Sequence, residues 1–154
     1  MLMNADLCGL IHRGGVFNIE ASTAEEAYKI VCNKMHLPVG MDKDIICDEL
    51  ILRENVLSTA VGNGIAIPHP RRPILHAVSD QRIALCFFNN PIDMHAPDNR
   101  KVYVMFILLS ATTQFHLEVL SELAVLFRNT EFRSLLETKP TEKDLLIAIK
   151  QAGF

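Results

Sequence analysis

The local sequence with the clearest potential for chemistry surrounds His69, in the run Gly62-Asn63-Gly64-Ile65-Ala66-Ile67-Pro68-His69-Pro70. Pro68 fixes its own φ, and Pro70 disfavours a helical backbone at the residue before it. We therefore expect His69 to be held extended at the end of a short strand. A nucleophile benefits from such a stiff support, because positioning supplies much of the catalysis in phosphoryl transfer. Taken alone, however, an isolated histidine is more often a surface-loop residue than a catalytic one.

A second histidine and an arginine could complete an anion site. His116 falls in the first turn of a helix that we expect to begin after Thr113, where unpaired N–H groups and the helix dipole favour an anion. Arg53 lies near the end of an earlier predicted helix, and a guanidinium suits phosphate recognition. Ser58 and Thr59 follow it and could donate hydroxyl hydrogen bonds. Taken alone, His116 and Arg53 are better explained by local packing and solvation.

Other catalytic and metal-binding motifs are missing from the sequence. The Gly62-Asn63-Gly64 turn lacks the lysine and hydroxyl of a P-loop, and no dinucleotide fingerprint is present. Without an HExxH motif or a Cys-His cluster, no metal site is expected. No GxSxG elbow indicates a serine nucleophile. The four cysteines, at positions 8, 32, 47 and 86, have no CxxC spacing and are expected to be buried thiols.

The composition is typical of one globular domain without a strong charge imbalance. The chain has 154 residues, 49% of them hydrophobic, and a formal net charge of -3, so no basic face for nucleic acid is indicated. Its longest apolar run, residues 102–109, is too short for a membrane-spanning helix, which needs about 20 residues. Residues 1–10 lack the features of a signal peptide. We expect a cytoplasmic protein with a single domain over residues 1–154, of which residues 1–20 are an N-terminal extension or the start of the domain.

Two helices are predicted in the first half of the chain. Ser22 and Glu25 fit a capping box, so a helix is expected over residues 24–34. Asp42 could cap a second helix that runs to about residue 54. The residues of this second helix in phase for a half-buried face are Ile45, Ile46, Glu49 and Leu52.

Strands and helices alternate through the rest of the chain. Residues 65–67 are a short extended segment, and the apolar runs 82–88 and 102–109 are typical of strands covered on both faces. Residues 89–91 and 96–99 are turn-forming. Helices are expected over about 114–128, with Thr113 as the cap, over 131–137, and from Thr141 onward. The predicted fold class is α/β, with a central β-sheet flanked by helices on both faces.

Two segments together carry a family resemblance. The run Arg53-Glu54-Asn55-Val56-Leu57-Ser58-Thr59-Ala60-Val61-Gly62-Asn63-Gly64-Ile65-Ala66-Ile67-Pro68-His69 resembles the active-site stretch of enzyme IIA domains of the fructose/mannitol/nitrogen-regulatory type. These domains belong to the phosphoenolpyruvate-dependent phosphotransferase system of bacteria. Further on, Pro91-Ile92-Asp93, Asp98, the apolar run 102–109 and His116-Leu117 are similar to a second part of the same pattern. The resemblance spans about residues 24–146.

The resemblance implies a role for each candidate residue. His69 would accept the phosphoryl group, His116 would contact that group and orient the His69 ring, and Arg53 would balance its charge. Ser58, Thr59 and Asn63 would line the site. The family fold is a central mixed sheet flanked by helices, and the chemistry requires no cofactor and no metal.

The resemblance also implies partners. A phosphorylated HPr-like carrier would supply the phosphoryl group, and a IIB domain of a sugar phosphotransferase system would receive it, which makes the chain a phosphotransferase component. The alternative is a stand-alone regulatory phosphoprotein of the nitrogen-regulatory kind, which controls partner proteins through its phosphorylation state. A third hypothesis, an interaction module without the chemistry, is disfavoured because both His69 and His116 are present. The sequence leaves the sugar, the regulated partner and the oligomeric state open.

The sequence departs from the family pattern at two positions. Pro70 stands where glycine commonly follows the active histidine, and proline offers neither a flexible backbone nor an N–H group. Arg71 and Arg72 follow it and could steer an anion or an acidic partner, or could be ordinary surface residues. Asn63 replaces a glutamate found in some mannitol-type members and resembles the nitrogen-regulatory pattern more closely.

Overall fold

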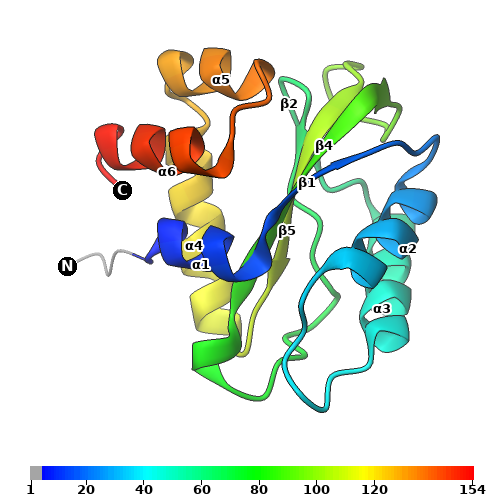
Figure 1. Ribbon diagram of the computed structural model, residues 1–154. Helices are drawn as coiled ribbons and strands as arrows, with labels where there is room; N and C mark the ends of the chain where they lie inside the picture. Colours follow the sequence, from blue (N-terminus) through cyan, green and yellow to red (C-terminus); the bar gives the residue numbers. More distant parts are fainter. Residues whose placement is uncertain (1–4) are drawn as a thin grey trace.

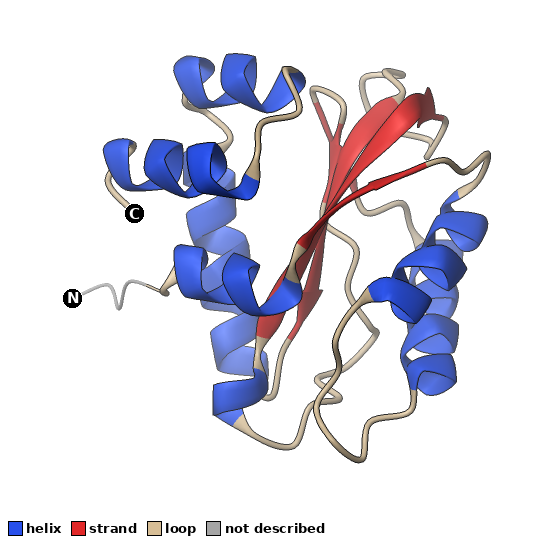
Figure 2. Ribbon diagram, in the orientation of Figure 1, coloured by secondary structure: helices blue, strands red, loops and turns tan. Residues whose placement is uncertain are grey.

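Two long apolar strands form the centre of the fold. The computed structural model describes residues 5–154, in which β4 (Arg82–Ile92) and β5 (Val102–Leu109) pair antiparallel. Most residues of both strands are buried, because helices cover both sides of the sheet (Figures 1 and 2). The near-continuous apolar sequence of these strands is the expected signature of such double coverage.

Three shorter strands complete a mixed sheet. β1 (Val16–Ile19) adds parallel to β4, and β3 (Ile65–Ala66) adds parallel to β5. β2 (Ala60–Gly62) pairs antiparallel with β3, which gives the strand order β1-β4-β5-β3-β2. The predicted mixed α/β architecture is confirmed. The order also places the end of β3 beside the end of β5, so the segments that follow these two strands emerge at the same edge of the sheet.

The helices form two layers, each with its own apolar core. α2 (Ala24–Lys34) and α3 (Lys43–Val56) cover one face of the sheet (Figure 1). α1 (Leu7–Gly14), α4 (Thr113–Leu126), α5 (Thr130–Glu137) and α6 (Glu142–Gln151) cover the other. Alternate residues of β5 enter alternate cores, as the pleat of a strand requires. A short 3₁₀ helix, Val78–Asp80, precedes β4. None of the helices described is both long and apolar enough to cross a bilayer.

Two predicted helix caps are wrong by one residue. Thr23 rather than Ser22 caps α2, because the Thr23 backbone is extended and its hydroxyl accepts the Glu26 N–H at 3.2 Å. Glu26, not Glu25, reaches back to accept the Ser22 N–H. Likewise Thr112, not Thr113, caps α4. In both cases the neighbouring residue also has a hydroxyl that could cap the helix, and the backbone conformation determines which of the two does so. The predicted cap of α3 is confirmed, since the Asp42 carboxylate accepts the Asp44 N–H.

The buried face of α3 is rotated from the predicted one. Ile45 and Leu52 are 55% and 44% exposed, whereas Cys47 and Leu50 are buried. Ile46 and Glu49 are buried as predicted. The buried face of α3 therefore consists of Ile46, Cys47, Glu49 and Leu50, and Cys47 and Leu50 take the places predicted for Ile45 and Leu52.

Strand β4 continues through a segment that we predicted to be a turn. Asn89, Asn90 and Pro91 belong to the strand, and their side chains are exposed. The ladder with β5 shifts register here and resumes where Ile92 pairs with Val102. Turn-forming residues are tolerated here because the ladder is irregular, so their backbone groups are not all required to form hydrogen bonds with β5. The predicted turn at 96–99 is present, with the Asn99 N–H bonded to the Ala96 carbonyl.

The sequence signals for α1 and β1 were missed. Leu7, Leu10 and Ile11 are buried, and Gly14 passes so close to β4 that a Cβ there would lie 1.9 Å from the Ile83 carbonyl oxygen. Much of the predicted N-terminal segment 1–20 thus packs into the same sheet and core, while residues 1–4 lie outside the described part of the chain.

Candidate active site

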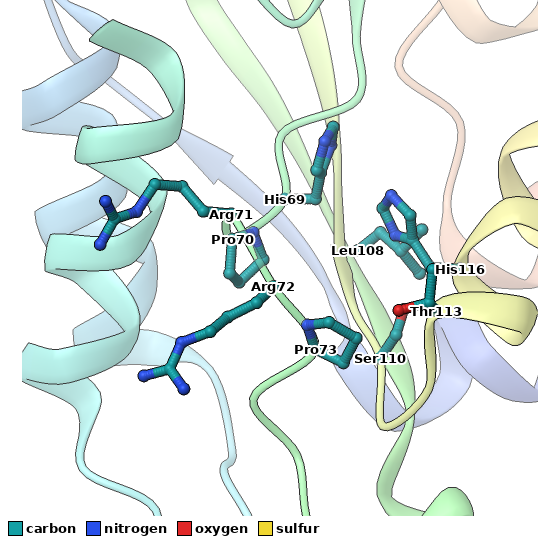
Figure 3. A pocket seen from close by; sticks show the side chains of 9 residues that line it. All are labelled: His69, Pro70, Arg71, Arg72, Pro73, Leu108, Ser110, Thr113 and His116. Atoms are coloured by element: carbon teal, nitrogen blue, oxygen red, sulfur yellow. The ribbon is translucent and has the colours of Figure 1, made fainter. Parts of the chain in front are cut away.

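The fold brings the two candidate histidines into contact. His69 lies just after β3, and His116 lies in the first turn of α4, which follows β5. Their ring centroids are 4.6 Å apart and the ring planes are inclined by 57°. A hydrogen bond of 2.8 Å from the Leu108 N–H to the Pro68 carbonyl ties the two segments together. Residues 47 positions apart in sequence therefore share one site at the edge of the sheet (Figure 3).

One ring nitrogen of His69 forms a hydrogen bond with the backbone. Nδ1 lies 2.8 Å from the carbonyl oxygen of Ile67. Because a carbonyl only accepts hydrogen bonds, Nδ1 carries the proton in the neutral ring. Nε2 is then unprotonated, and its lone pair is available for attack. Because donor and acceptor are only two positions apart in sequence, this geometry is set within the Ile67-Pro68-His69 segment itself.

Both imidazoles are held in the neutral form. Burial lowers the pKa of His69, and the Arg53 charge lowers it further, while the Ile67 hydrogen bond and the Glu54 charge oppose the change. Burial lowers the pKa of His116 to about 4, with smaller contributions from His69 and Arg53. At neutral pH the site thus holds two uncharged rings beside a guanidinium.

Arg53 supplies the positive charge near the two rings. It lies in the last turn of α3, and its guanidinium donates to the Leu57 carbonyl at 2.5 Å. This bond folds the arginine side chain back over the end of its own helix. The positive charge of Arg53 lowers the pKa of both His69 and His116, though burial is the larger cause at each ring.

The other three predicted site residues make hydrogen bonds elsewhere. The Ser58 hydroxyl donates to the Met94 carbonyl, and the Thr59 hydroxyl donates to Glu54 at 2.6 Å. Asn63 occupies the β2–β3 turn with a φ of 57°, and its N–H donates to the Asp98 carboxylate. These residues shape the loop that leads to His69, and they bond to Met94, Glu54 and Asp98 rather than to the two imidazoles.

A pocket of about 120 Å³ opens beside the two histidines (Figure 3). Its walls are formed by His69, Pro70, Arg71, Arg72, Pro73, Leu108, Ser110, Thr113 and His116. The side chains of Arg71 and Arg72 point away from the imidazoles, and Arg71 pairs with Glu49 at 3.1 Å. The Ser110 hydroxyl is buried and has no hydrogen-bond partner within residues 5–154.

Three functionally placed residues were missed by sequence reasoning. Glu54 accepts hydrogen bonds from Thr59 and from Tyr28, which comes from the neighbouring helix α2. Its position directly after Arg53, at the end of the same predicted helix, was a usable signal that Glu54 lies near the same loop. For Tyr28 and Ser110 the sequence contains no comparable signal, because only the packing brings them near the site.

The arrangement is suited to nucleophilic transfer of an anionic group. It offers an unprotonated ring nitrogen on a stiff support, a second neutral imidazole in contact with it, and a nearby positive charge. No cluster of three or more potential metal ligands occurs in the described part of the chain.

Comparisons with known proteins agree on one family. Residues 13–152 match the family described as Phosphoenolpyruvate-dependent sugar phosphotransferase system, EIIA 2. A nitrogen regulatory protein of Pseudomonas aeruginosa is 36% identical over 106 residues, covering 68% of this chain and 67% of that protein. A mannitol-specific phosphotransferase enzyme IIA component of Halalkalibacterium halodurans is 30% identical over 112 residues, covering 73% and 74%.

Solved structures show the same fold. Nitrogen regulatory protein IIA-Ntr of Neisseria meningitidis superposes with a TM-score of 0.73 at 27% identity, covering 87% of this chain and 91% of that one. An Escherichia coli complex of enzyme IIA mannitol with phosphorylated enzyme IIB mannitol has a TM-score of 0.67 at 16% identity, covering 88% and 94%. At that identity the likeness concerns the fold alone.

Proposed function

The chain belongs to the EIIA 2 family of the phosphoenolpyruvate-dependent sugar phosphotransferase system, and on this premise we propose that His69 carries the phosphoryl group of a phosphohistidine relay. The single observation that most supports this assignment is the hydrogen bond from Nδ1 of His69 to the Ile67 carbonyl. It leaves Nε2 as the nucleophile, in a ring that touches His116 and is neutral at physiological pH.

In the proposed transfer, the Nε2 lone pair of His69 attacks the phosphorus of a phosphohistidine on an HPr-like carrier. The new N–P bond forms as the carrier's N–P bond breaks, and the electron pair of the broken bond returns to the carrier's ring nitrogen. Nδ1–H of His69 keeps its bond to Ile67 and stabilises the positive charge that develops on the ring. The reverse sequence of bonds passes the group to an acceptor.

His116 and Arg53 act on the phosphoryl group in this proposal. The neutral His116 ring donates a hydrogen bond to a phosphoryl oxygen and packs against the His69 ring. The Arg53 guanidinium offsets the negative charge. The loop that carries His69 is held by hydrogen bonds of Ser58, Thr59 and Asn63. Residues 1–154 are proposed to act as one cytoplasmic EIIA-like domain.

Two functional outputs are possible for the phosphorylated protein, and they differ in the partner that it acts on. A IIB domain of a sugar system is the first, because IIA domains interact with IIB domains, as the Escherichia coli complex illustrates. Control of partner proteins by phosphorylation state is the second. Relatives named nitrogen regulatory protein in Pseudomonas aeruginosa and Klebsiella oxytoca support this second output, and the mannitol-specific relative in Halalkalibacterium halodurans supports the first.

Labelling by a phosphorylated carrier tests the proposal. The wild-type chain, His69→Ala and His116→Ala are incubated with phosphoenolpyruvate, enzyme I and HPr, and incorporation of phosphate is followed with time. We expect His69→Ala to take up no label and His116→Ala to take it up more slowly while keeping its fold by circular dichroism. Full labelling of His69→Ala would contradict the assignment of the acceptor, and unchanged kinetics of His116→Ala would remove that residue from the mechanism.

A further inference from the structure

We propose that Glu54 is a positioning residue for phosphoryl transfer, which sets the orientation and tautomer of the His69 ring through Thr59 and Ile67. The inference rests on the proposed role of His69 as the acceptor. The Glu54 carboxylate is bonded to Tyr28 and Thr59 rather than to either imidazole, and a continuous series of hydrogen bonds leads from it to His69.

The first step of the series is the set of contacts at Glu54. The side chain leaves the last turn of α3 and accepts three hydrogen bonds on its two carboxylate oxygens. One comes from the Thr59 N–H at 2.8 Å and one from the Thr59 hydroxyl at 2.6 Å. The third comes from the hydroxyl of Tyr28, whose side chain is fully buried between the helices and the sheet. Thr59 is thus held by both its backbone and its side chain.

The second step runs from Thr59 to the histidine. The Thr59 carbonyl accepts the Ile67 N–H at 3.0 Å, directly beside the Ala60–Ala66 pair of the β2–β3 ladder. The Ile67 carbonyl then accepts Nδ1–H of His69 at 2.8 Å. The hydrogen bonds that connect Glu54, Thr59, Ile67 and the His69 ring all have ordinary lengths. A shift of Thr59 is therefore transmitted to the carbonyl that selects the His69 tautomer.

A carboxylate is needed at this position for a geometric reason. Tyr28 and Thr59 direct one N–H group and two hydroxyl groups at Glu54, and a carboxylate can accept from all three at once. Glutamine has nearly the same shape and can keep the Thr59 N–H bond through its oxygen, but its NH₂ group then faces the two hydroxyls, which must turn round to accept instead of donate. Glu54→Gln therefore reverses two of the three bonds and removes the negative charge that strengthens them, without removing bulk from the site.

The test compares Glu54→Gln with a matched control, Glu122→Gln. Glu122 is also a partly buried carboxylate that accepts a backbone N–H, from Ala5 at 2.8 Å, but it lies on the far part of α4. Two quantities are measured for each variant. The tautomer of the unphosphorylated His69 ring is read from its side-chain ¹⁵N shifts by NMR at pH 8, and the initial rate of transfer from phosphorylated HPr is read by labelling.

We expect Glu54→Gln to lower the transfer rate by roughly 10- to 100-fold, since a misplacement of about 1 Å can cost about 100-fold. The same variant should convert part of the His69 population from the Nδ1–H to the Nε2–H tautomer. Glu122→Gln should change neither quantity. An unchanged rate in Glu54→Gln would overturn the proposal. A lower rate with the Nδ1–H tautomer fully retained would overturn it too, because Glu54 would then act by another route.

Thr59→Val provides a second test that leaves the Glu54 side chain itself unchanged. It has the shape of threonine and keeps the backbone N–H but loses the hydroxyl donor to Glu54. We expect a smaller loss of rate, several-fold, with a tautomer change in the same direction, and the absence of both would overturn the proposal. The tautomer measurement needs no transfer activity. A wild-type chain that is never phosphorylated would thus refute the proposed function, while the NMR comparison would still decide the role of Glu54.

Discussion

Acidification of the protein should protonate His116 far later than an ordinary histidine. Burial lowers its pKa to about 4, from a usual value of about 6.5. At pH 5.5 an ordinary histidine is about 90% protonated, whereas His116 should be only about 3% protonated. The site is therefore expected to keep this ring neutral across the whole physiological range.

The same difference in pKa makes the stability of the folded protein depend on pH. Between pH 6.5 and 4 the unfolded chain binds a proton at His116 that the folded chain does not, so the free energy of unfolding falls as the pH falls. Above pH 6.5 the contribution is fully present. The full difference in pKa corresponds to about 3 kcal/mol at 1.36 kcal/mol per pKa unit. Because the ring is only half-buried, solvent screening should reduce this to about 1–2 kcal/mol.

Imidazole resonances followed by NMR from pH 8 to pH 3.5 give the titration directly, with the urea-unfolded chain as the control. We expect a midpoint near 4 in the folded protein and near 6.5 in urea. His69→Gln should raise the midpoint of His116 but leave it below 6.5, since burial is the larger cause of the low pKa. A midpoint near 6.5 in the folded wild-type protein would refute the desolvated, neutral site from which the mechanism is argued.

Three further changes test the packing around the site, all measured by urea unfolding. Gly64→Ala should destabilise the protein by about 2 kcal/mol or more, because Gly64 has a φ of 78° and a Cβ there would lie 2.5 Å from the Tyr103 ring; a loss below about 0.5 kcal/mol would contradict this close approach. Gly14→Ala should cost about 3 kcal/mol, because its Cβ would overlap the Ile83 carbonyl; an unaffected variant would mean that α1 does not pack on β4 as described. Ser110→Ala should be neutral or stabilising by up to about 1 kcal/mol, because the buried hydroxyl has no partner among the described residues; a clear destabilisation would reveal a bond that the described contacts lack.

The elements with strong periodicity were predictable from sequence, and their ends were not. The helix 24–34 and the strand 102–109 have the predicted bounds, since each combines a clear apolar pattern with flanking turn or capping residues. The observed caps, Thr23 and Thr112, differ by one residue from the predicted ones, because the neighbouring residues have equivalent side-chain oxygens. α1 was missed although Asp6 caps it and Leu7, Leu10 and Ile11 lie at helical spacing, a pattern that our prediction did not use.

The candidate site was predictable where the backbone itself does the positioning. The two prolines around His69 fix that residue locally, and its hydrogen bond to Ile67 spans only two positions. The contact with His116 could not be derived from spacing, because it depends on β3 and β5 lying side by side, and only the family resemblance indicated it. The bond between Tyr28 and Glu54 joins two helices through a buried core, which no sequence pattern specifies.

The most direct test of the central claim is to locate the phosphoryl group after transfer from phosphorylated HPr. Intact mass, peptide mapping under mildly basic conditions and ³¹P NMR together identify the residue and the nitrogen that carry it. We predict one acid-labile, base-stable phosphoryl group per chain, attached to Nε2 of His69. Attachment to another residue, or to Nδ1 of His69, would contradict the account, because the bond to the Ile67 carbonyl leaves Nε2 as the free nucleophile.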